Sequence, residues 1–337
     1  MKLSQLQAVL AVAECGSLRA AGRHLKIAQP AITRSIREIE RELGVSLFER
    51  TAKGVRVTPI GAAFLRRAEA IRAELQRATD EIEQLKGRTS GQVSLGLSGP
   101  ASIVLLPRAV QAFRKRFPDA VIKVIEAMFQ SVEQDLLDGR IDFYVGPIDP
   151  NVSRIRLMVE ELYVNQRRVM ARKGHPLLNA RRLSELKDAK WLRPTHIARN
   201  TEADFSAMLA DLGLPNANIV VHGSATLTTL PLIAASDLLT VLPETMLEFA
   251  PFAEILEPLK LEEQIPGVTT SIVRRHDMPL TPMAEHLCDQ VRRIGQSFAE
   301  AKPGRMPRKR EAAQRGVFAG AAGGEDGARP LPAVRDA

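Results

Sequence analysis

Side chains able to hydrogen-bond with nucleic-acid bases gather at the start of one amphipathic segment, residues 27–44 (IAQPAITRSIREIERELG). Gln29 can form a bidentate pair with adenine, and Arg34 is of the type that most often reads guanine. Pro30 offers an apolar surface to a thymine methyl group, and Thr33 lies on the next turn. A solvated helix face has a similar composition, so the segment alone leaves both interpretations open.

A helix is expected to position these side chains. Its apolar residues fall on one stripe that should pack inward, namely Ile32, Ile36, Ile39 and Leu43. Arg34, Arg37 and Arg41 share another stripe, which could face phosphate or water. The helix should begin at about Gln29 and end at Gly44.

Two shorter helical patterns precede this segment. The first has apolar residues at three- and four-residue steps from Leu3 to Ala13, with Gly16 as its stop. Ser17 is a suitable N-cap for the second, residues 18–25. Two short helices, a tight turn and a third helix form a helix-turn-helix, whose last helix reads base edges with its N-terminal residues.

A small β-hairpin, or wing, is expected next. Short segments at 47–50 and 55–58 flank the sequence AKG, where Gly54 can take a positive φ. Residues 1–58 hold ten Lys and Arg against five Asp and Glu, a net charge of +5. Glu38, Glu40 and Glu42 lie late in the third helix, so its start is free of acidic residues, which fits entry into a groove by the N-terminus.

A long helix is predicted from Pro59 to about Leu85. Its apolar residues recur every seven residues in two sets that lie three residues apart. They are Ala68, Leu75 and Ile82, and Ile71, Ala78 and Leu85. This a/d pattern predicts a dimerisation seam. The alternative is a long helix packed on its own domain.

The remainder of the chain divides into a linker, an α/β region and a tail. After the linker at 86–91, β-like runs alternate with helical ones to about residue 300. This alternation predicts mostly parallel sheets, and the length of the region favours two lobes. The tail, 301–337, is rich in Gly, Pro, Ala and Arg, and is expected to be disordered. Its basic run at 308–310 could add nonspecific DNA affinity, or the tail could be solvated and have no role.

The separate runs within the α/β region can be assigned by type. Strands are expected at 92–98, 120–126, 141–146, 218–223, 238–243 and 269–275. Helices are expected at 103–117, 131–139, 203–213 and 282–298.

Composition narrows the class of protein. A chain of 337 residues with 45% apolar and 26% charged residues is typical of a soluble protein of two or three domains. Its net charge of +8 points weakly toward a polyanion such as nucleic acid or a membrane surface. Cys15 and Cys288 form no CxxC pair, so reduced thiols in a cytoplasmic protein are expected.

Sequence signals for membrane insertion, secretion and catalysis are missing. The chain has no run of about 18 apolar residues and no signal-peptide pattern. It has no P-loop, no GxGxxG after a strand and no nucleophile elbow, and its six His residues lack metal-ligand spacing. We therefore expect neither a catalytic site nor a metal or cofactor site.

Residues 17–61 resemble the N-terminal signature of LysR-type transcriptional regulators. The shared motifs are S-x-x-A-A from Ser17, Q-P-A-I-T from Gln29, LGVSLFER from Leu43 and T-P-x-G from Thr58. Further stretches match effector-domain segments of that family, namely FPDAVIKVIEA, LLDGRIDFYVG, HPL and RRHDMPLTP. The last is also similar to members that govern the catabolism of aromatic acids. The resemblance spans residues 1 to about 298 and excludes the tail.

The resemblance implies a winged helix-turn-helix at 1–58, a linker and dimerisation helix at 59–86, and an effector domain at 91–300. That domain would have two Rossmann-like lobes similar to periplasmic binding proteins, lobe 1 at about 91–162 and 268–300 and lobe 2 at about 163–267. The chain would then be a sequence-specific transcriptional regulator on promoter DNA, a homodimer or homotetramer located at the nucleoid in the cytoplasm. RNA polymerase would be a further candidate partner.

The DNA-contacting residues follow from the matched positions. By the resemblance, Gln29, Pro30, Thr33 and Arg34 read bases. Candidates for phosphate or minor-groove contact are Ser17, Arg19, Arg37, Arg50, Lys53 and Arg56. The alternative for Arg50 is an ion pair within the domain. The family usually has Ser or Thr where this chain has Ala28, and the loss of such a cap costs about 1 kcal/mol.

The resemblance also implies a small effector between the lobes, with chain crossings near 162–164 and 266–268. In lobe 1 the candidates are Ser98, Gly99 and Ser102, because helix N-termini hold anions. In lobe 2 they are Thr195, His196, Arg199, Thr201, Ser224 and Thr226. Arg199 could pair with a carboxylate or sulfonate, such as an aromatic acid. Simple helix caps are the alternative for the Ser and Thr residues, and a DNA-bridging architectural protein without ligand response is the alternative function.

Overall fold

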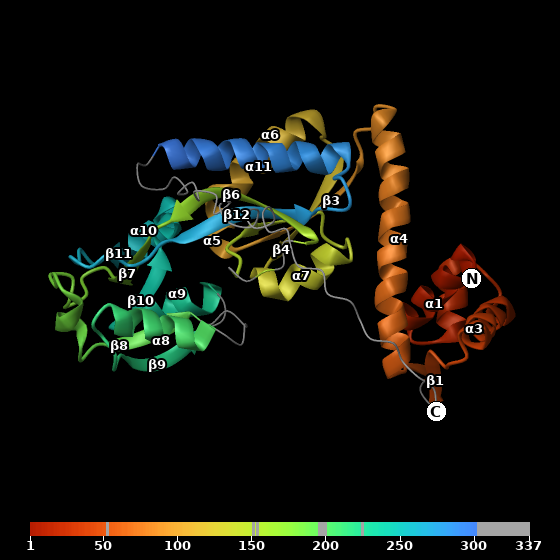
Figure 1. The fold of residues 1–337 in the computed structure, drawn as a ribbon, viewed down its shortest axis with the longest axis horizontal. Helices are drawn as coiled ribbons and strands as arrows, with labels where there is room; N and C mark the ends of the chain where they lie inside the picture. Colours follow the sequence, from red (N-terminus) through yellow and green to blue (C-terminus); the bar gives the residue numbers. More distant parts are fainter. Residues whose placement is uncertain (52–53, 150–151, 153–154, 195–200, 224–225, 302–337) are drawn as a thin grey trace, which may run out of the picture. The chain divides into compact units, whose positions relative to one another are not determined.

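The computed structural model describes residues 1–51, 54–149, 152, 155–194, 201–223 and 226–301. It opens with three helices, α1 (Leu3–Cys15), α2 (Leu18–Leu25) and α3 (Gln29–Leu43) (Figure 1). A two-stranded antiparallel wing follows, made of β1 (Phe48–Thr51) and β2 (Gly54–Val57). The winged helix-turn-helix expected from the sequence is confirmed.

Local sequence signals set the limits of these helices. Gly16 and Gly44 end α1 and α3 at φ +68° and +70°, in the left-handed region that favours glycine. The Ser17 hydroxyl accepts a hydrogen bond of 3.1 Å from the Ala20 N–H and so caps α2. Three of the four residues of the predicted inward stripe of α3 lie in the domain core, in which the buried residues include Val9, Val12, Ile32, Ile36, Ile39 and Leu47. The fourth, Leu43, is exposed, because it lies in the last turn of the helix, just before Gly44.

The wing is tied to the turn between α1 and α2. The Val55 N–H donates to the Gly16 carbonyl over 3.0 Å. A Cβ on Gly54 would lie 2.5 Å from that same oxygen, and its φ is +137°. Both facts require glycine at position 54.

The T-P-x-G motif joins the wing to the long helix α4 (Pro59–Leu85). The Thr58 hydroxyl accepts from the Gly61 N–H at 2.9 Å and donates to the Ser46 carbonyl at 2.8 Å. Pro59 occupies the first helical position. A Cβ on Gly61 would lie 2.1 Å from the Leu47 carbonyl oxygen, so the motif packs the helix start directly against the backbone before the wing.

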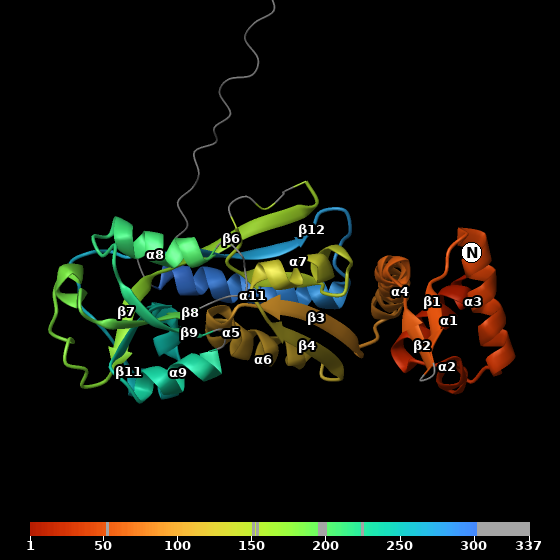
Figure 2. The ribbon, with the colours of Figure 1, turned by 90° about the horizontal axis from the view of Figure 1, so that it is seen from below.

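Lobe 1 is a five-stranded sheet with helices on both faces. Its strand order is β4-β3-β5-β12-β6. The strands are β3 (Gly91–Leu97), β4 (Ala120–Glu126), β5 (Phe143–Gly146), β6 (Leu157–Asn165) and β12 (Val268–Arg275). The helices are α5 (Gly99–Val104), α6 (Leu106–Arg116), α7 (Phe129–Leu137) and α11 (Pro282–Glu300). Helices α6 and α11 share one core with the sheet, and α7 packs in a separate core on the other face (Figure 1; in Figure 2, α7 lies in front of α11).

Lobe 2 holds a second sheet, of order β11-β7-β10-β8-β9. Its strands are β7 (Arg167–Arg172), β8 (Lys190–Pro194), β9 (Asn218–Gly223), β10 (Leu238–Pro243) and β11 (Leu256–Pro258). Its helices are α8 (Thr201–Asp211), α9 (Thr226–Ala234) and α10 (Ala250–Ile255), with 3₁₀ turns η1 (Leu183–Leu186) and η2 (Glu244–Glu248).

Both sheets are mixed, and not mostly parallel as the alternation predicted. In lobe 1, β3 runs parallel to β4 and β5, whereas β12 is antiparallel to β5 and β6. In lobe 2, β8 is parallel to β9 and β10, while β7 is antiparallel to β10 and β11. The reason is that β6 and β12 carry the chain from one lobe to the other, without the helical crossover that makes neighbouring strands parallel.

Several boundaries differ from the predicted ones. Strands β6, β7, β8 and β11 were not predicted, and the helix expected at 103–117 is divided at Leu105 into α5 and α6. The first crossing falls at 165–167, because β6 stays paired with β12 as far as Asn165 opposite Val268. Among the described residues, no helix is long and apolar enough to cross a membrane.

Candidate nucleic-acid interface and effector cleft

The start of α3 is exposed on its outer side. Gln29, Pro30 and Ala31 are all solvent-exposed, and the helix begins after Ala28, whose side chain makes no capping hydrogen bond. Thr33 is half-buried, and its hydroxyl donates to the Gln29 carbonyl over 3.1 Å. Two of the predicted base-reading side chains, Gln29 and Pro30, are therefore free to meet a ligand, while the Thr33 hydroxyl is engaged with the backbone.

Arg34 is held by Glu38 of its own helix, and α1 in turn supports Glu38. Its Nε donates to the Glu38 carboxylate over 2.7 Å, and the Gln5 side chain of α1 donates to the other oxygen of Glu38 over 3.0 Å. The Arg34 side chain is still 81% exposed. The hydrogen bonds from Arg34 and Gln5 hold the pKa of the Glu38 carboxyl below its ordinary value, so the carboxylate stays ionised and orients the guanidinium.

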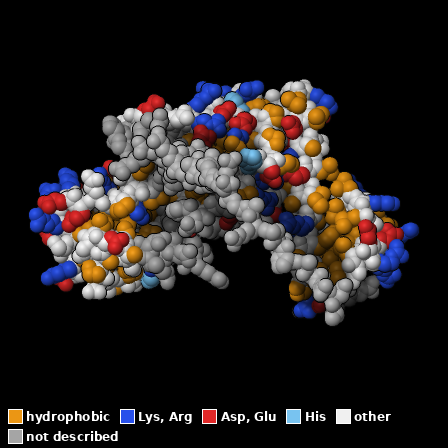
Figure 3. Space-filling view, in the orientation of Figure 1, with side chains coloured by type: hydrophobic (Ala, Val, Ile, Leu, Met, Phe, Trp, Pro, Cys, Tyr) orange, Lys and Arg blue, Asp and Glu red, His pale blue; other side chains and the backbone are white. Residues whose placement is uncertain are grey.

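The later acidic residues of α3 have structural partners. The Glu40 carboxylate accepts from the N–H groups of Leu47 and Phe48, at 2.8 and 3.2 Å, and fixes the entry to the wing. Glu42 accepts from the amino group of Met1 at 2.9 Å. The acidic residues late in α3 thus stabilise the domain itself. The asymmetry of charge along α3 therefore has a structural cause besides any role in binding a polyanion. Lys and Arg side chains line the outer edge of this domain (Figure 3).

The candidate phosphate contacts fall into three groups. Arg19 and Arg37 are exposed, and Ser17 caps α2. Arg56 is exposed but pairs with Glu49 across the wing at 2.6 Å. Lys53 and the side chain of Arg50 lie outside the described residues, so the two interpretations of Arg50 stay open. Their roles in binding DNA remain predictions.

Lys26 is a further exposed basic residue next to α3 that was not among the predicted DNA contacts. It ends α2 in a left-handed conformation, at φ +56°, and its side chain is exposed in the turn that leads to α3. A basic residue in the four-residue connection KIAQ was the available signal.

The predicted seam of α4 is largely exposed. Ile71, Leu75, Ala78, Ile82 and Leu85 all face solvent in the single chain. Figure 3 shows hydrophobic side chains gathered over this part of the molecule. Ala68 differs: it is 1% exposed, because it packs against Leu6 and Leu10 of α1. The first position of the seam is thus occupied within its own chain.

The start of α5 lies where the lobes meet. Ser98 is 2% exposed and precedes α5 without forming a side-chain cap. The Ser102 hydroxyl donates to the Gly99 carbonyl over 2.7 Å, which is a local structural role. One residue further on, Ile103 packs against the lobe 2 core that includes Leu192 and Leu242. The lobe 1 candidates are therefore adjacent to the boundary between lobes.

Two of the six lobe 2 candidates begin helices. Thr195, His196, Arg199 and Ser224 lie outside the described residues. Thr201 and Thr226 begin α8 and α9, and their side chains lie outside the described part of the structure. These two helices follow the carboxyl ends of the parallel strands β8 and β9, which is where α/β sheets commonly bind ligands.

The two chain crossings are bonded to each other and to lobe 2. The Arg167 Nε donates to the Pro266 carbonyl over 2.6 Å. The Asn165 side-chain amide donates to the Thr245 hydroxyl over 2.9 Å. Two short, adjacent crossings of this kind are typical of lobes joined by a hinge.

Two further cavities of about 350 Å³ each involve other residues. One is lined by Glu69, Arg72, Ala73, Gln76 and Arg140, and the other by residues around His175 and Lys260. Neither contains a predicted effector residue. Across the described part of the chain, no three His, Cys, Asp or Glu side chains form a group that could hold a metal ion.

Two family profiles match the chain. Residues 3–62 match the profile described as bacterial regulatory helix-turn-helix protein, lysR family, and residues 86–296 match the LysR substrate binding domain. The chain is 29% identical over 235 residues to the HTH-type transcriptional regulator TdcA of Escherichia coli (strain K12), covering 69% of this chain and 74% of the relative. It is 32% identical over 179 residues to PcaQ of Agrobacterium fabrum, covering 53% and 58%.

Solved structures share the fold. Full-length CbnR in complex with its target DNA superposes with a TM-score of 0.66 at 21% identity, covering 87% of this chain and 100% of the other. Full-length BenM superposes with a TM-score of 0.52 at 25% identity, covering 88% and 98%.

Proposed function

We propose, from the premise that the chain belongs to the LysR family of bacterial DNA-binding transcriptional regulators, that a small anionic effector bound between its two lobes controls its action on promoter DNA. One observation carries the proposal. Two adjacent crossings, bonded through Arg167 and Pro266, join the lobes in the same compact unit as the exposed start of α3, and would act as a hinge. A ligand that binds the closed lobes better than the open ones would shift the population of the two states.

The effector is proposed to be an aromatic carboxylate or sulfonate. Ser98, Gly99 and Ser102 would contribute from lobe 1, where Ser98 is buried beside the inter-lobe contact of Ile103. From lobe 2 the contribution would come from Thr195, His196, Arg199, Thr201, Ser224 and Thr226. A guanidinium such as Arg199 suits a planar acid group, because its donors form two parallel hydrogen bonds.

The DNA-bound form is proposed to be a dimer or tetramer. In it, each recognition helix would place Gln29, Pro30, Thr33 and Arg34 in the major groove of one half-site, at the nucleoid. The functional division would then be 1–58 for DNA binding, 59–86 for dimerisation and 91–300 for effector binding. Closure of the lobes would alter the bend of the promoter and thereby the access of RNA polymerase.

The test uses DNA upstream of the protein's own gene, with benzoate, salicylate and benzenesulfonate as probes and neutral benzamide as the control. An acid at about 100 times its Kd should raise the folding stability by about 2.7 kcal/mol and change the footprint. Ser98→Ala should weaken this shift, and Ser131→Ala, on α7, should leave it intact. If no acid changes melting or footprint while DNA binding persists, the effector proposal fails and a DNA-bridging architectural role takes its place.

A further inference from the structure

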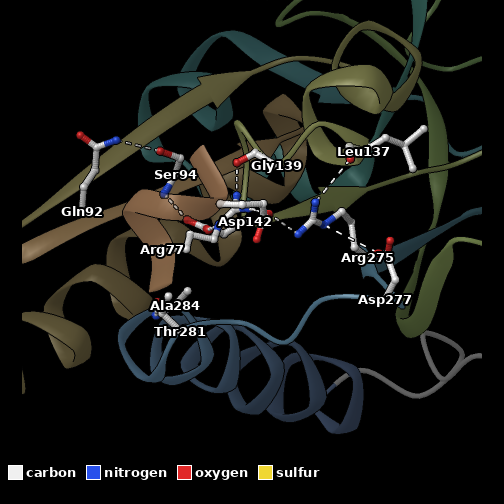
Figure 4. Close-up of polar contacts among 11 residues, drawn as sticks. Arg77, Gln92, Ser94, Leu137, Gly139, Asp142, Arg275, Asp277, Thr281 and Ala284 are labelled. Carbon is white, nitrogen blue, oxygen red and sulfur yellow. Dashed lines mark hydrogen bonds and ion pairs between the residues drawn. The ribbon is translucent and has the colours of Figure 1, made fainter. Parts of the chain in front are cut away.

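Three charged side chains on one face of α4 each pair with lobe 1. Glu69 accepts from Arg140 at 3.1 Å, Glu74 accepts from Arg275 at 2.5 Å, and Arg77 donates to Asp142 at 3.2 Å. Arg77 also donates to the Gly139 carbonyl (Figure 4). At 3.6 residues per turn, the three side chains span about 140° of the helix. We call Glu74, Arg77, Asp142 and Arg275 the α4 clamp.

The clamp and the apolar seam occupy different faces of α4. The five exposed seam residues, from Ile71 to Leu85, span about 80° of the helix, in the sector next to the one that holds Glu74 and Arg77, since each residue advances the helix by about 100°. Attachment of α4 to lobe 1 therefore sets the direction in which the seam is presented to a second copy of the chain.

The clamp is much more buried than an ordinary surface ion pair. The side chains of Asp142 and Arg275 are each 11% exposed, and that of Arg77 is 16% exposed. Asp142 is also held within lobe 1, since its carboxylate accepts from the Ser94 N–H of β3 at 2.7 Å (Figure 4). Exposed pairs contribute little, but loss of one partner from a buried pair leaves an uncompensated charge.

The clamp lies at the end of the strand that returns from lobe 2. Arg275 is the last residue of β12, and Val268 at the other end follows the hinge. The Arg275 guanidinium bonds to Glu74 of α4 and, at 3.5 Å, to the Leu137 carbonyl at the end of α7. One strand thus connects the inter-lobe hinge directly to the dimerisation helix.

We propose that the α4 clamp docks the dimerisation helix onto lobe 1 in cis, and that its release or reinforcement by lobe closure is how an effector changes the arrangement of the dimer. The docking of α4 onto lobe 1 is independent of any ligand. The coupling of the clamp to lobe closure rests on the proposed effector function. Glu74 and Arg275 are positioning residues in this proposal. Both lie outside the DNA-binding domain, and neither is among the effector candidates.

The balance of desolvation and attraction within the α4 clamp is compatible with its opening. Burial raises the pKa of the Asp142 carboxyl above its ordinary value, although the Ser94 N–H and the guanidinium groups of Arg77 and Arg275 favour its ionised form. The desolvation of Asp142 therefore offsets much of the attraction within the clamp. Because desolvation and attraction oppose each other, a modest bias from lobe closure would be able to shift the clamp between its docked and undocked states.

Hydrogen exchange on the full chain tests the docking. In Glu74→Gln and in Arg275→Gln, backbone amides of residues 69–77 and 135–143 should exchange about tenfold faster than in the wild type. Arg72→Gln is the matched control, because Arg72 lies on α4 but pairs with Glu14 of α1. Wild-type exchange in both single variants would overturn the docking.

Footprinting with and without benzoate tests the coupling. Glu74→Gln should bind operator DNA within about threefold of the wild-type affinity, because it leaves the DNA-binding domain intact, yet lose most of the benzoate-induced change. A wild-type response in Glu74→Gln would overturn the coupling. A wild-type protein that ignores benzoate, salicylate and benzenesulfonate would instead count against the effector proposal, and the exchange experiment would still decide the docking.

Discussion

The Arg34 guanidinium donates a 2.7 Å hydrogen bond to the Glu38 carboxylate one turn further along α3, and Gln5 of α1 holds the same carboxylate from the other side. An exposed arginine would otherwise sample many rotamers, so this arrangement lowers the conformational entropy that is lost when the side chain meets a base. The pair is exposed, and so it is easily broken when DNA arrives.

Arg34→Ala should reduce affinity for the operator by roughly 5- to 150-fold, since one bidentate base contact discriminates by about 1–3 kcal/mol. Arg41→Ala, at the far end of the same helix, should have little effect. Fluorescence anisotropy at a single salt concentration, on operator and scrambled DNA, measures both. Wild-type affinity in the double variant Gln29→Ala/Arg34→Ala would refute the base-reading role of α3.

Ala28→Ser should restore the missing cap of α3 and stabilise it by about 1 kcal/mol, because a serine hydroxyl there can accept a backbone N–H of the first turn. Amides of α3 should then exchange about five times more slowly. Ala31→Ser places the same hydroxyl inside the exposed first turn and should give no such protection. Equal protection in both variants would argue against capping.

Leu75→Arg should shift the protein toward monomer, since it places a charge in the middle of the seam, where a partner helix would have to desolvate it. The single chain should remain folded, because Leu75 is already exposed. Gln76→Lys is the control, for its position faces away from the seam and keeps a partner in Asp80. Light scattering at micromolar concentration reads the mass, and an unchanged mass for Leu75→Arg would contradict the assignment.

Protonation of His286 should destabilise the folded protein in mild acid. Its ring packs on Phe117 at 5.5 Å between centroids, and burial, followed by the charges of Arg116 and Arg293, lowers its pKa although Asp289 opposes this. The unfolded chain then binds the proton more tightly, so this contribution is present above the ordinary pKa of about 6.5 and is lost as pH falls through the folded value.

His286→Gln removes the titrating ring, so its melting temperature should fall less than that of the wild type between about pH 7.5 and 5.5. Comparing the pH-dependent change within each variant separates titration from the packing lost with the ring. Parallel curves for the two proteins would show that His286 does not contribute.

Much of the DNA-binding domain could be predicted because its signals are local. The inward stripe of α3, the cap at Ser17, the stops at Gly16 and Gly44 and the T-P-x-G motif each act over a few residues. Hydrophobic periodicity and backbone conformation are properties of short segments, so they can be read before the fold is known.

The lobes were predictable as a class but not in their topology. Strands β6 and β7 lacked turn signals, and the pairing of β6 with β12 joins segments about a hundred residues apart. Whether a strand runs parallel or antiparallel depends on the path by which the chain returns to the sheet, and short-range patterns do not contain that path.

The sequence by itself determined the recognition helix, the wing, the long helix and the family, because each depends on residue types at short, regular spacing. Only the tertiary structure decided that Ala68 is buried against α1, and that Glu74 meets Arg275 from 201 positions away. The physical reason is that a charged residue looks the same in the sequence whether it faces water or an ion partner. Its burial and its partner follow from chain segments that only folding brings together.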